Sequence, residues 1–169
     1  ANAPLTMGET PLMTAARAGD LDTVRLLLAH GADVEATERD RRQTALMWAV
    51  ANRHPDITRV LLEHDAAVDA RTTAVRQLRG TGERSTTSPQ GSTYFDAGGF
   101  TPLLFAARHG DVDSAALLLD AGADVNDTAA DGNSALVLAA MSDHAPLGEF
   151  LLERGADPDA SGAGYSALH

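Results

Sequence analysis

The stretch at residues 99–126, GFTPLLFAARHGDVDSAALLLDAGADVN, decides the fold because its pattern of turn, helix, turn and helix recurs on both sides of it. Thr101 can cap a first helix with its hydroxyl, and Pro102 suits the first helical position, where an N–H has no partner. Gly110 predicts the end of this short helix. A second helix is predicted over residues 112–121. Because a helix pair this small cannot bury its apolar surface alone, copies of it must stack.

The repeat is anchored by a triplet of Thr or Ser, then Pro or Ala, then Leu. Its copies begin at Thr10, Thr44, Thr101, Ser134 and Ser166. Successive starts lie 34, 57, 33 and 32 residues apart. In each full copy a Leu-Leu pair begins 17 residues after the start of the triplet. A turn of the Gly-Ala-Asp-Val type follows each pair, at residues 31–34, 65–68, 122–125 and 155–158.

A period near 33 residues with these motifs resembles the ankyrin repeat, and its wording is similar to that of bacterial ankyrin arrays. The resemblance covers residues 7–169 except for one insert. It implies an all-α solenoid of stacked helix-turn-helix units, with β-turn or hairpin fingers and one long inter-repeat loop, in a single domain over residues 1–169. We expect full repeats at about residues 5–38, 39–71, 96–128 and 129–160, a partial fifth at 161–169, and an insert loop at 72–95.

Composition narrows the possible functions. The net charge is −11, and all 13 basic residues are arginine, which disfavours nucleic acid and anionic membranes as partners. Such acidity favours a basic or Arg-accepting protein partner, although it can also serve only to keep the array soluble. The absence of cysteine excludes disulfides and thiolate chemistry. No apolar run reaches membrane-spanning length and residues 1–7 show no targeting pattern, so we expect a soluble chain of unknown compartment.

The second repeat departs most from the pattern. Arg53 and Asp65 stand where a helix-ending Gly is usual, and a left-handed non-Gly residue costs about 1 kcal/mol. This repeat is therefore predicted either to be the least stable or to end its helices differently. Trp48 lies in its first helix, where we predict a core side chain; a ligand-facing side chain is the alternative. The fourth repeat is predicted to be regular.

The insert at residues 72–95, TTAVRQLRGTGERSTTSPQGSTYF, breaks the period. Its start, TAVRQLR, predicts one helical turn, and the Gly, Ser and Pro residues that follow predict a loop. The insert carries a net charge of +2 in an acidic chain. Its arginines either fold back onto the acidic repeats or form, with the repeats, a mixed-charge rim around a ligand groove. Tyr94 and Phe95 are expected to attach the loop to the scaffold.

No catalytic or metal-binding motif is visible. The segment at residues 80–82 lacks the Lys-Ser/Thr of a phosphate loop, and no nucleophile elbow is present. Asp33, Asp124 and Asp157 belong to the repeated turn, so we assign them to the scaffold. The six histidines lack the paired spacing of a zinc site. We therefore predict no enzyme activity, no cofactor and no metal.

The resemblance implies partner binding at a concave face lined by the first helices and the fingers. We accordingly predict a protein–protein interaction scaffold that binds an unidentified protein through the concave face and the insert loop at residues 72–95. The expected binding residues lie either at positions whose residue type differs from one repeat to the next or in the insert. They are Arg17, Arg41, Gln43, Asn52, Arg76, Arg79, Arg84, Tyr94, Phe95, Phe100, Arg108, His109, Asp131, Asn133, Met141 and Tyr165. Large aromatic and Arg side chains among them are the expected hot spots.

A second hypothesis comes from the ends of the array. The first repeat resembles an internal repeat, and the fifth stops inside its first helix. In this hypothesis the chain is a regulatory or targeting segment of a larger enzyme or toxin. The unfinished apolar end of the array also predicts weak self-association. A small-molecule or metal site in the insert is disfavoured, because the sequence shows neither convergent ligands nor a large apolar pocket.

Overall fold

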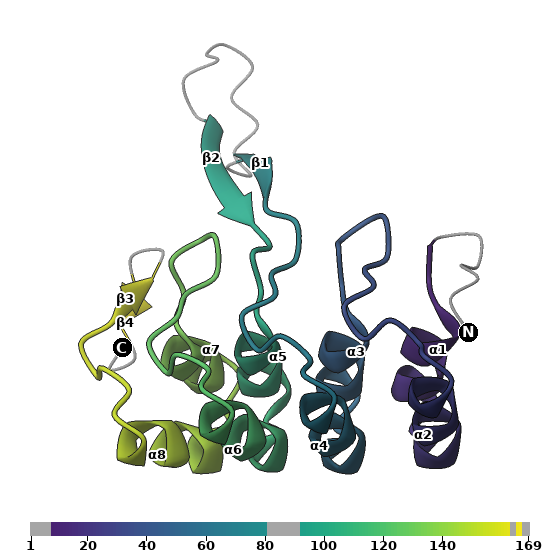
Figure 1. Cartoon of the computed structure of the whole chain (residues 1–169). Helices are drawn as coiled ribbons and strands as arrows, with labels where there is room; N and C mark the ends of the chain where they lie inside the picture. Colours follow the sequence, from purple (N-terminus) through teal and green to yellow (C-terminus); the bar gives the residue numbers. More distant parts are fainter. Residues whose placement is uncertain (1–7, 81–91, 163–164, 167–169) are drawn as a thin grey trace.

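The computed structural model describes residues 8–80, 92–162 and 165–166. In these ranges the chain forms eight helices arranged as four helix-turn-helix pairs (Figure 1). The pairs are α1 (Pro11–Ala18) with α2 (Leu21–Ala29), α3 (Ala45–Ala51) with α4 (Pro55–Glu63), α5 (Pro102–His109) with α6 (Val112–Asp120), and α7 (Ala135–Met141) with α8 (Ala145–Glu153). The predicted all-α solenoid is confirmed.

The helices form two layers. The first helices α1, α3, α5 and α7 pack in this order, and the second helices α2, α4, α6 and α8 pack in a parallel row. The turns before α3, α5 and α7 project from the stack as fingers. We number the fingers by the helix pair that follows them: the second finger is residues 33–43, the third residues 66–100 and the fourth residues 123–133 (Figure 1).

Local chemistry sets the helix ends. The hydroxyls of Thr10, Thr44 and Ser134 each accept the N–H three residues on, at 3.3 Å. Gly19 and Gly110 end α1 and α5 in the left-handed conformation. These caps explain why the bounds of α1, α3 and α7 follow directly from the triplet. The predicted cap by the Thr101 hydroxyl is wrong, because this hydroxyl makes no cap hydrogen bond at the start of α5.

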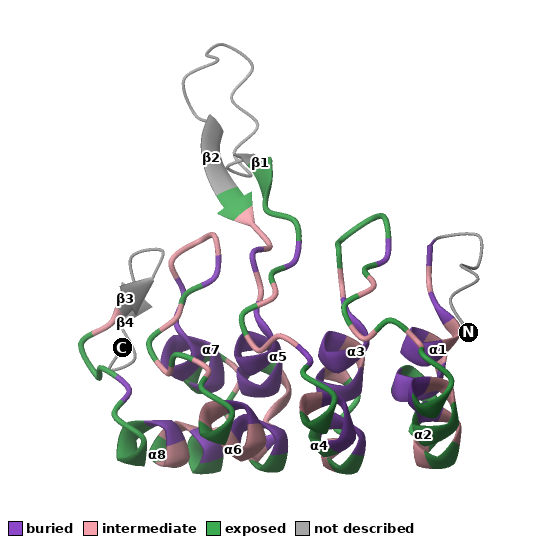
Figure 2. Ribbon diagram, in the orientation of Figure 1, coloured by how far each residue is buried: buried purple, intermediate pink, exposed green. Residues whose placement is uncertain are grey.

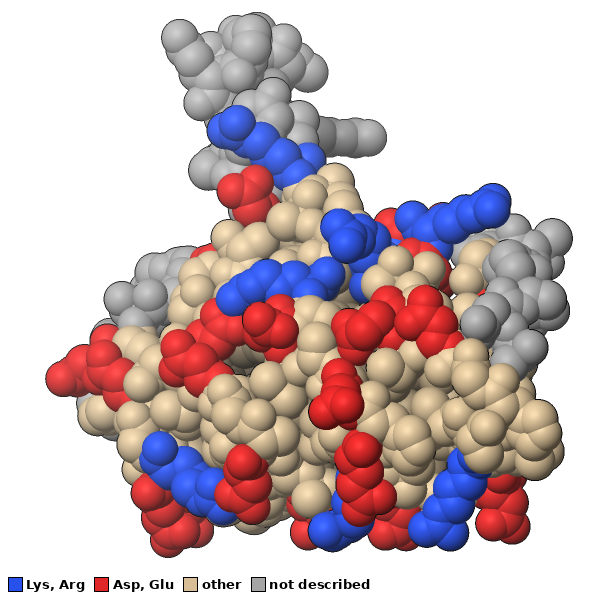
Figure 3. Space-filling model, in the orientation of Figure 1, with Lys and Arg blue, Asp and Glu red and all other residues tan. Residues whose placement is uncertain are grey.

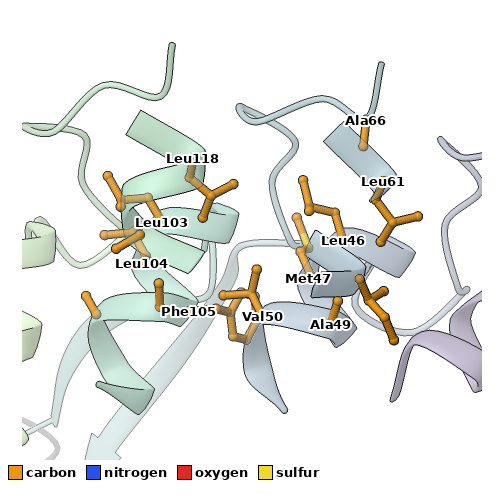
Figure 4. Packing of buried hydrophobic residues seen from close by; sticks show 14 of the residues in the cluster. Leu46, Met47, Ala49, Val50, Leu61, Ala66, Leu103, Leu104, Phe105 and Leu118 are labelled. Carbon is orange, nitrogen blue, oxygen red and sulfur yellow. The ribbon is translucent and has the colours of Figure 1, made fainter. Parts of the chain in front are cut away.

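The core lies between neighbouring pairs as well as within each pair. Leu46 and Leu61 from one pair, and Leu103 and Leu118 from the next, are almost fully buried (Figures 2 and 4). Figure 4 shows Val50 of α3 beside the residues of α5. Burying one such side chain stabilises the fold by about 1.5–3 kcal/mol. The contact between pairs is thus as much a part of the core as the pair itself.

The repeated aspartate of the turns has a structural role. Asp33, Asp124 and Asp157 each accept, through Oδ1, the N–H of the residue two positions later, at 2.9–3.0 Å. Such a bond fixes the turn locally. The assignment of these carboxylates to the scaffold is confirmed.

Residues with a left-handed backbone conformation occur at the positions that the sequence predicts and at other positions. Arg53 and Asp65 have φ of 58° and 61°, as expected. The fourth repeat was predicted to be regular, which is wrong, because Asp143 has φ of 59° at the position that Gly19 and Gly110 occupy in repeats one and three.

Glycine is required at that position only where a histidine follows in the next repeat. A Cβ on Gly19 would meet the His54 ring at 2.8 Å, and a Cβ on Gly110 would meet the His144 ring at 2.7 Å. After Arg53, the corresponding position of the next repeat holds Asp111 instead of a histidine. The smaller side chain explains why a Cβ is accommodated there.

The insert is the main correction to the predicted fold. Its start was expected to form a helical turn and instead forms β1 (Val75–Gly80), which pairs antiparallel with β2 (Ser92–Ala97). A seven-residue helix without packing partners is marginal, whereas β-branched Val75 on β1 and Thr93, Tyr94 and Phe95 on β2 are residue types that favour strands. In Figure 1 this hairpin extends beyond the other fingers. A second, short pair joins β3 (Ser161–Gly162) to β4 (Tyr165–Ser166).

We predict that Gly19→Ala destabilises the chain more than Gly31→Ala. The two glycines have φ of 77° and 74°, so the backbone strain is alike, but only the Cβ at residue 19 meets a ring, that of His54. The common strain is about 1 kcal/mol, and the collision adds about 1 kcal/mol more. Chemical denaturation followed by circular dichroism measures both values, and equal losses would contradict the proposed collision.

Candidate functional site

The residues four and seven positions after each first-helix cap lie on one side of the first-helix layer, because positions three apart share a helix face. We call this side the inner face. The residues at these positions are Thr14, Arg17, Trp48, Ala51, Phe105, Arg108, Leu138 and Met141. Exposure differs widely along it, from 9% at Phe105 to 65% at Met141. The residue types at these positions differ between repeats, whereas the buried positions beside them hold apolar residues in every repeat.

Arginine and aromatic side chains pair on the inner face. The Arg17 guanidinium lies 4.7 Å from the centre of the Trp48 ring. Arg108 lies 5.7 Å from the ring centre of Phe100, which is itself 5.5 Å from that of Phe105. Each exposed cation–π pair is worth about 0.5–1 kcal/mol. The pairs hold arginine groups in place on a partly exposed surface.

Trp48 differs from its predicted place in the core. It is half-buried on the inner face and lies outside the core cluster. The reason is its position in α3, one residue after Met47, which takes the buried side of the same helix. Its Nε1 is buried and has no hydrogen-bond partner among the described residues.

A cavity of about 290 Å³ opens between the second finger, the base of the hairpin and α5. Its lining combines apolar and charged groups. The residues are Asp40, Arg41, Gln43, Thr72, Thr73, Val75, Gln77, Ala97, Gly98, Phe100, Phe105 and Arg108. The site thus joins side chains that are up to 68 positions apart in the sequence.

Backbone hydrogen bonds fix the wall that the hairpin contributes. Thr72 donates its N–H to the Phe100 carbonyl at 3.0 Å, and its hydroxyl accepts the Phe100 N–H at 2.9 Å. The Thr73 N–H donates to the Arg41 carbonyl of the second finger at 2.8 Å. Gly98 lies so close to this segment that a Cβ on it would be 2.1 Å from the Thr73 oxygen. We call residues 72–73 and 97–100 the hairpin root.

Arg71 extends this network to the fourth finger. Its guanidinium donates to the carbonyls of Gly99 and Thr128 at 3.1 and 2.9 Å and forms an ion pair with Asp127. The Ala130 N–H donates to the Gly98 carbonyl at 3.0 Å. The hairpin root is therefore bonded to the fingers on both sides of it.

Four of the predicted site residues meet at the cavity, namely Arg41, Gln43, Phe100 and Arg108. Arg17 and Met141 lie further along the inner face, and Arg76 is exposed on β1. His109 ends α5 beside Arg108.

Other predicted residues serve the scaffold. The Asn52 side-chain amide donates to the Trp48 carbonyl at 2.8 Å at the end of α3. Asp131 accepts both the backbone and side-chain N–H groups of Asn133, which is only 6% exposed. These three residues shape the helix end and the fourth finger.

Some predicted site residues cannot be placed. Arg84 lies outside the described residues. Arg79 is in β1, Tyr94 and Phe95 are in β2, and Tyr165 is in β4, but their side chains are not among those described.

Nine residues of the site were absent from the predicted set: Trp48, Phe105, Asp40, Thr72, Thr73, Val75, Gln77, Ala97 and Gly98. A signal for the first two was present, because the position four residues after the cap holds a different side chain in every repeat. Val75, Gln77 and Ala97 join the site through strand pairing, which the repeat pattern does not encode.

Charge is unevenly distributed over the molecule. Figure 3 shows blue gathered over β1 and the second finger, with red along the turns below them. In the second finger, Glu38 is buried and accepts the N–H groups of Asp40, Arg41 and Gln43 at 2.6–3.0 Å. The negatively charged Glu38 carboxylate is thus satisfied by hydrogen bonds within the turn. Arg41 forms no ion pair with any described carboxylate.

Ionisable groups at the end of α5 influence one another. Burial lowers the pKa of the His109 imidazole below its usual value, and the positive charges of Arg108, His144 and Arg53 act in the same direction. Asp111 opposes them. The described part of the chain contains no group of three metal-ligating side chains. Nor does it contain a helix long and apolar enough to cross a membrane.

The stacked pairs, the projecting fingers and the variable inner face define a repeat solenoid. A family model described as ankyrin repeats (3 copies) matches residues 1–72 and 71–162. The chain therefore belongs to the ankyrin repeat family. Ankyrin repeats are generally protein–protein interaction modules, and the family is typically non-enzymatic. A comparison with curated proteins finds no match.

We predict that acidification destabilises the chain partly through His109. Its folded-state pKa is lowered, so the unfolded chain binds the proton more readily once the pH falls below about 6.5. His109→Gln should therefore lose less stability than the parent between pH 7 and pH 5. Urea unfolding at both pH values measures the difference, and identical losses in the two proteins would show that His109 does not contribute.

Proposed function

We propose that the chain is a protein-interaction scaffold that binds a partner through the inner face and the hairpin root, without catalysis. The observation that carries this proposal is the cavity, where the second finger, the hairpin and α5 present side chains to one point. The Arg–aromatic pairs beside it supply the residue types that carry most interface energy. The inner face corresponds to the concave face that the family resemblance implied.

The rigidity of the hairpin root supports the proposal. Its hydrogen bonds to both neighbouring fingers hold the wall of the cavity in one conformation. A preformed wall reduces the conformational entropy lost on binding. The hairpin is thus suited to extend the surface that a partner contacts.

The first test compares two double variants with the same change in charge. Arg17→Glu/Arg108→Glu alters the inner face, whereas Arg25→Glu/Arg59→Glu alters exposed positions on the second helices. We expect the inner-face variant to lose at least about tenfold in affinity for a partner captured from cell extract and then purified, and the control to keep it. Isothermal titration calorimetry measures both affinities. Equal losses, or a loss in the control alone, would place binding elsewhere.

The second test removes the hairpin beyond its root. Replacing residues 76–95 with a short turn keeps the root and the repeats, so we expect a thermal midpoint within about 4 °C of the parent. Binding to the same purified partner should weaken, because the strands beyond the root, with Gln77 of the cavity lining, are lost. Unchanged affinity would remove the hairpin from the binding surface.

A further inference from the structure

The chemistry of the cavity indicates what the partner presents to it. We propose that the cavity takes one apolar side chain of an extended partner segment that carries Asp or Glu next to it, with the carboxylate bound by the arginines of the lining. This inference rests on the proposed function and specifies the partner's chemistry. The expectation from net charge favoured a basic or an Arg-accepting partner, and this inference corresponds to the second of these.

Local charge supports an acidic segment. Arg41 and Arg108 line the cavity against one carboxylate, Asp40. Arg39 and Arg42 are exposed on the same finger, and neither forms an ion pair with any residue in the described ranges. Glu38 is committed to its own turn, so the tip of the second finger, residues 39–43, presents three arginines and one carboxylate to its surroundings. A carboxylate is the group that guanidinium binds with matched geometry.

The apolar part of the cavity supports the neighbouring side chain. Phe100 and Phe105 contribute their rings, and Val75, itself 51% exposed, contributes an aliphatic surface from β1. A volume of about 290 Å³ lies at the lower limit of small-molecule sites and suits a side chain of a peptide. The exposed strand β1 borders the cavity, so an extended segment fits the space beside it.

The test is a selection of displayed random 12-residue peptides on the intact chain. We expect the selected sequences to be enriched in an apolar residue adjacent to Asp or Glu. A synthetic peptide from this set should shift the amide resonances of Thr73 and Gly98 in nuclear magnetic resonance spectra. Its affinity should fall at least tenfold when its acid is changed to the amide, and at least tenfold when its apolar residue is changed to Ala.

Variants of the chain complete the test. Arg108→Gln should weaken the peptide at least fivefold, whereas Arg59→Gln, on the second-helix layer, should leave its affinity unchanged. Peptides that bind at the cavity but lack an acid, or that keep full affinity for Arg41→Gln and Arg108→Gln, would overturn this inference and leave the proposed function standing. Peptides that bind only at the second helices, or no selected peptides at all, would contradict both.

Discussion

Apolar surface buried between one helix pair and the next is the interaction on which the whole structure depends. No pair has a closed core of its own, so Leu46 and Leu103 are excluded from water only because pairs stack. Stacking also places equivalent positions of successive first helices side by side. The inner face is therefore a consequence of the core: residues that vary between repeats, such as Trp48 and Phe105, line up because the residues beside them are apolar and buried in every repeat.

Neighbouring repeats are coupled by a second, polar interaction at the start of the second helices. Asp20 and Asp111 cap their own helices. His54 and His144 hold the same position but place Nε2 3.3 Å from a carbonyl of the preceding repeat. A histidine here requires glycine in the repeat before it, because the ring occupies the space of a Cβ. Histidine at the cap of a second helix thus determines the backbone conformation of a residue about 35 positions earlier in the sequence.

The repeat framework was predictable, because Thr10, Pro11 and Gly19 define a helix through local caps that need no tertiary information. α1 begins and ends where these residues place it. The hairpin was not predictable, since Val75 pairs with Ala97 across an insert and the energy of that pairing is not local. The cavity depends on the same pairing. The exposure of Trp48 was mispredicted because helix rotation, set by stacking, decides which of two adjacent side chains is buried.

If the hydrogen bonds of the hairpin root are stable, the insert is part of a preformed site; if they are not, the insert is only an appendage to the repeats. Amide hydrogen exchange at Thr73 and Ala130 measures this most directly, because their N–H groups form the bonds that join the root to the second and fourth fingers. Protection comparable to that of the amides within α3 and α5 is the predicted result. Exchange at the rate of an unprotected chain would contradict the account, since the wall of the cavity would then not be held by the stack.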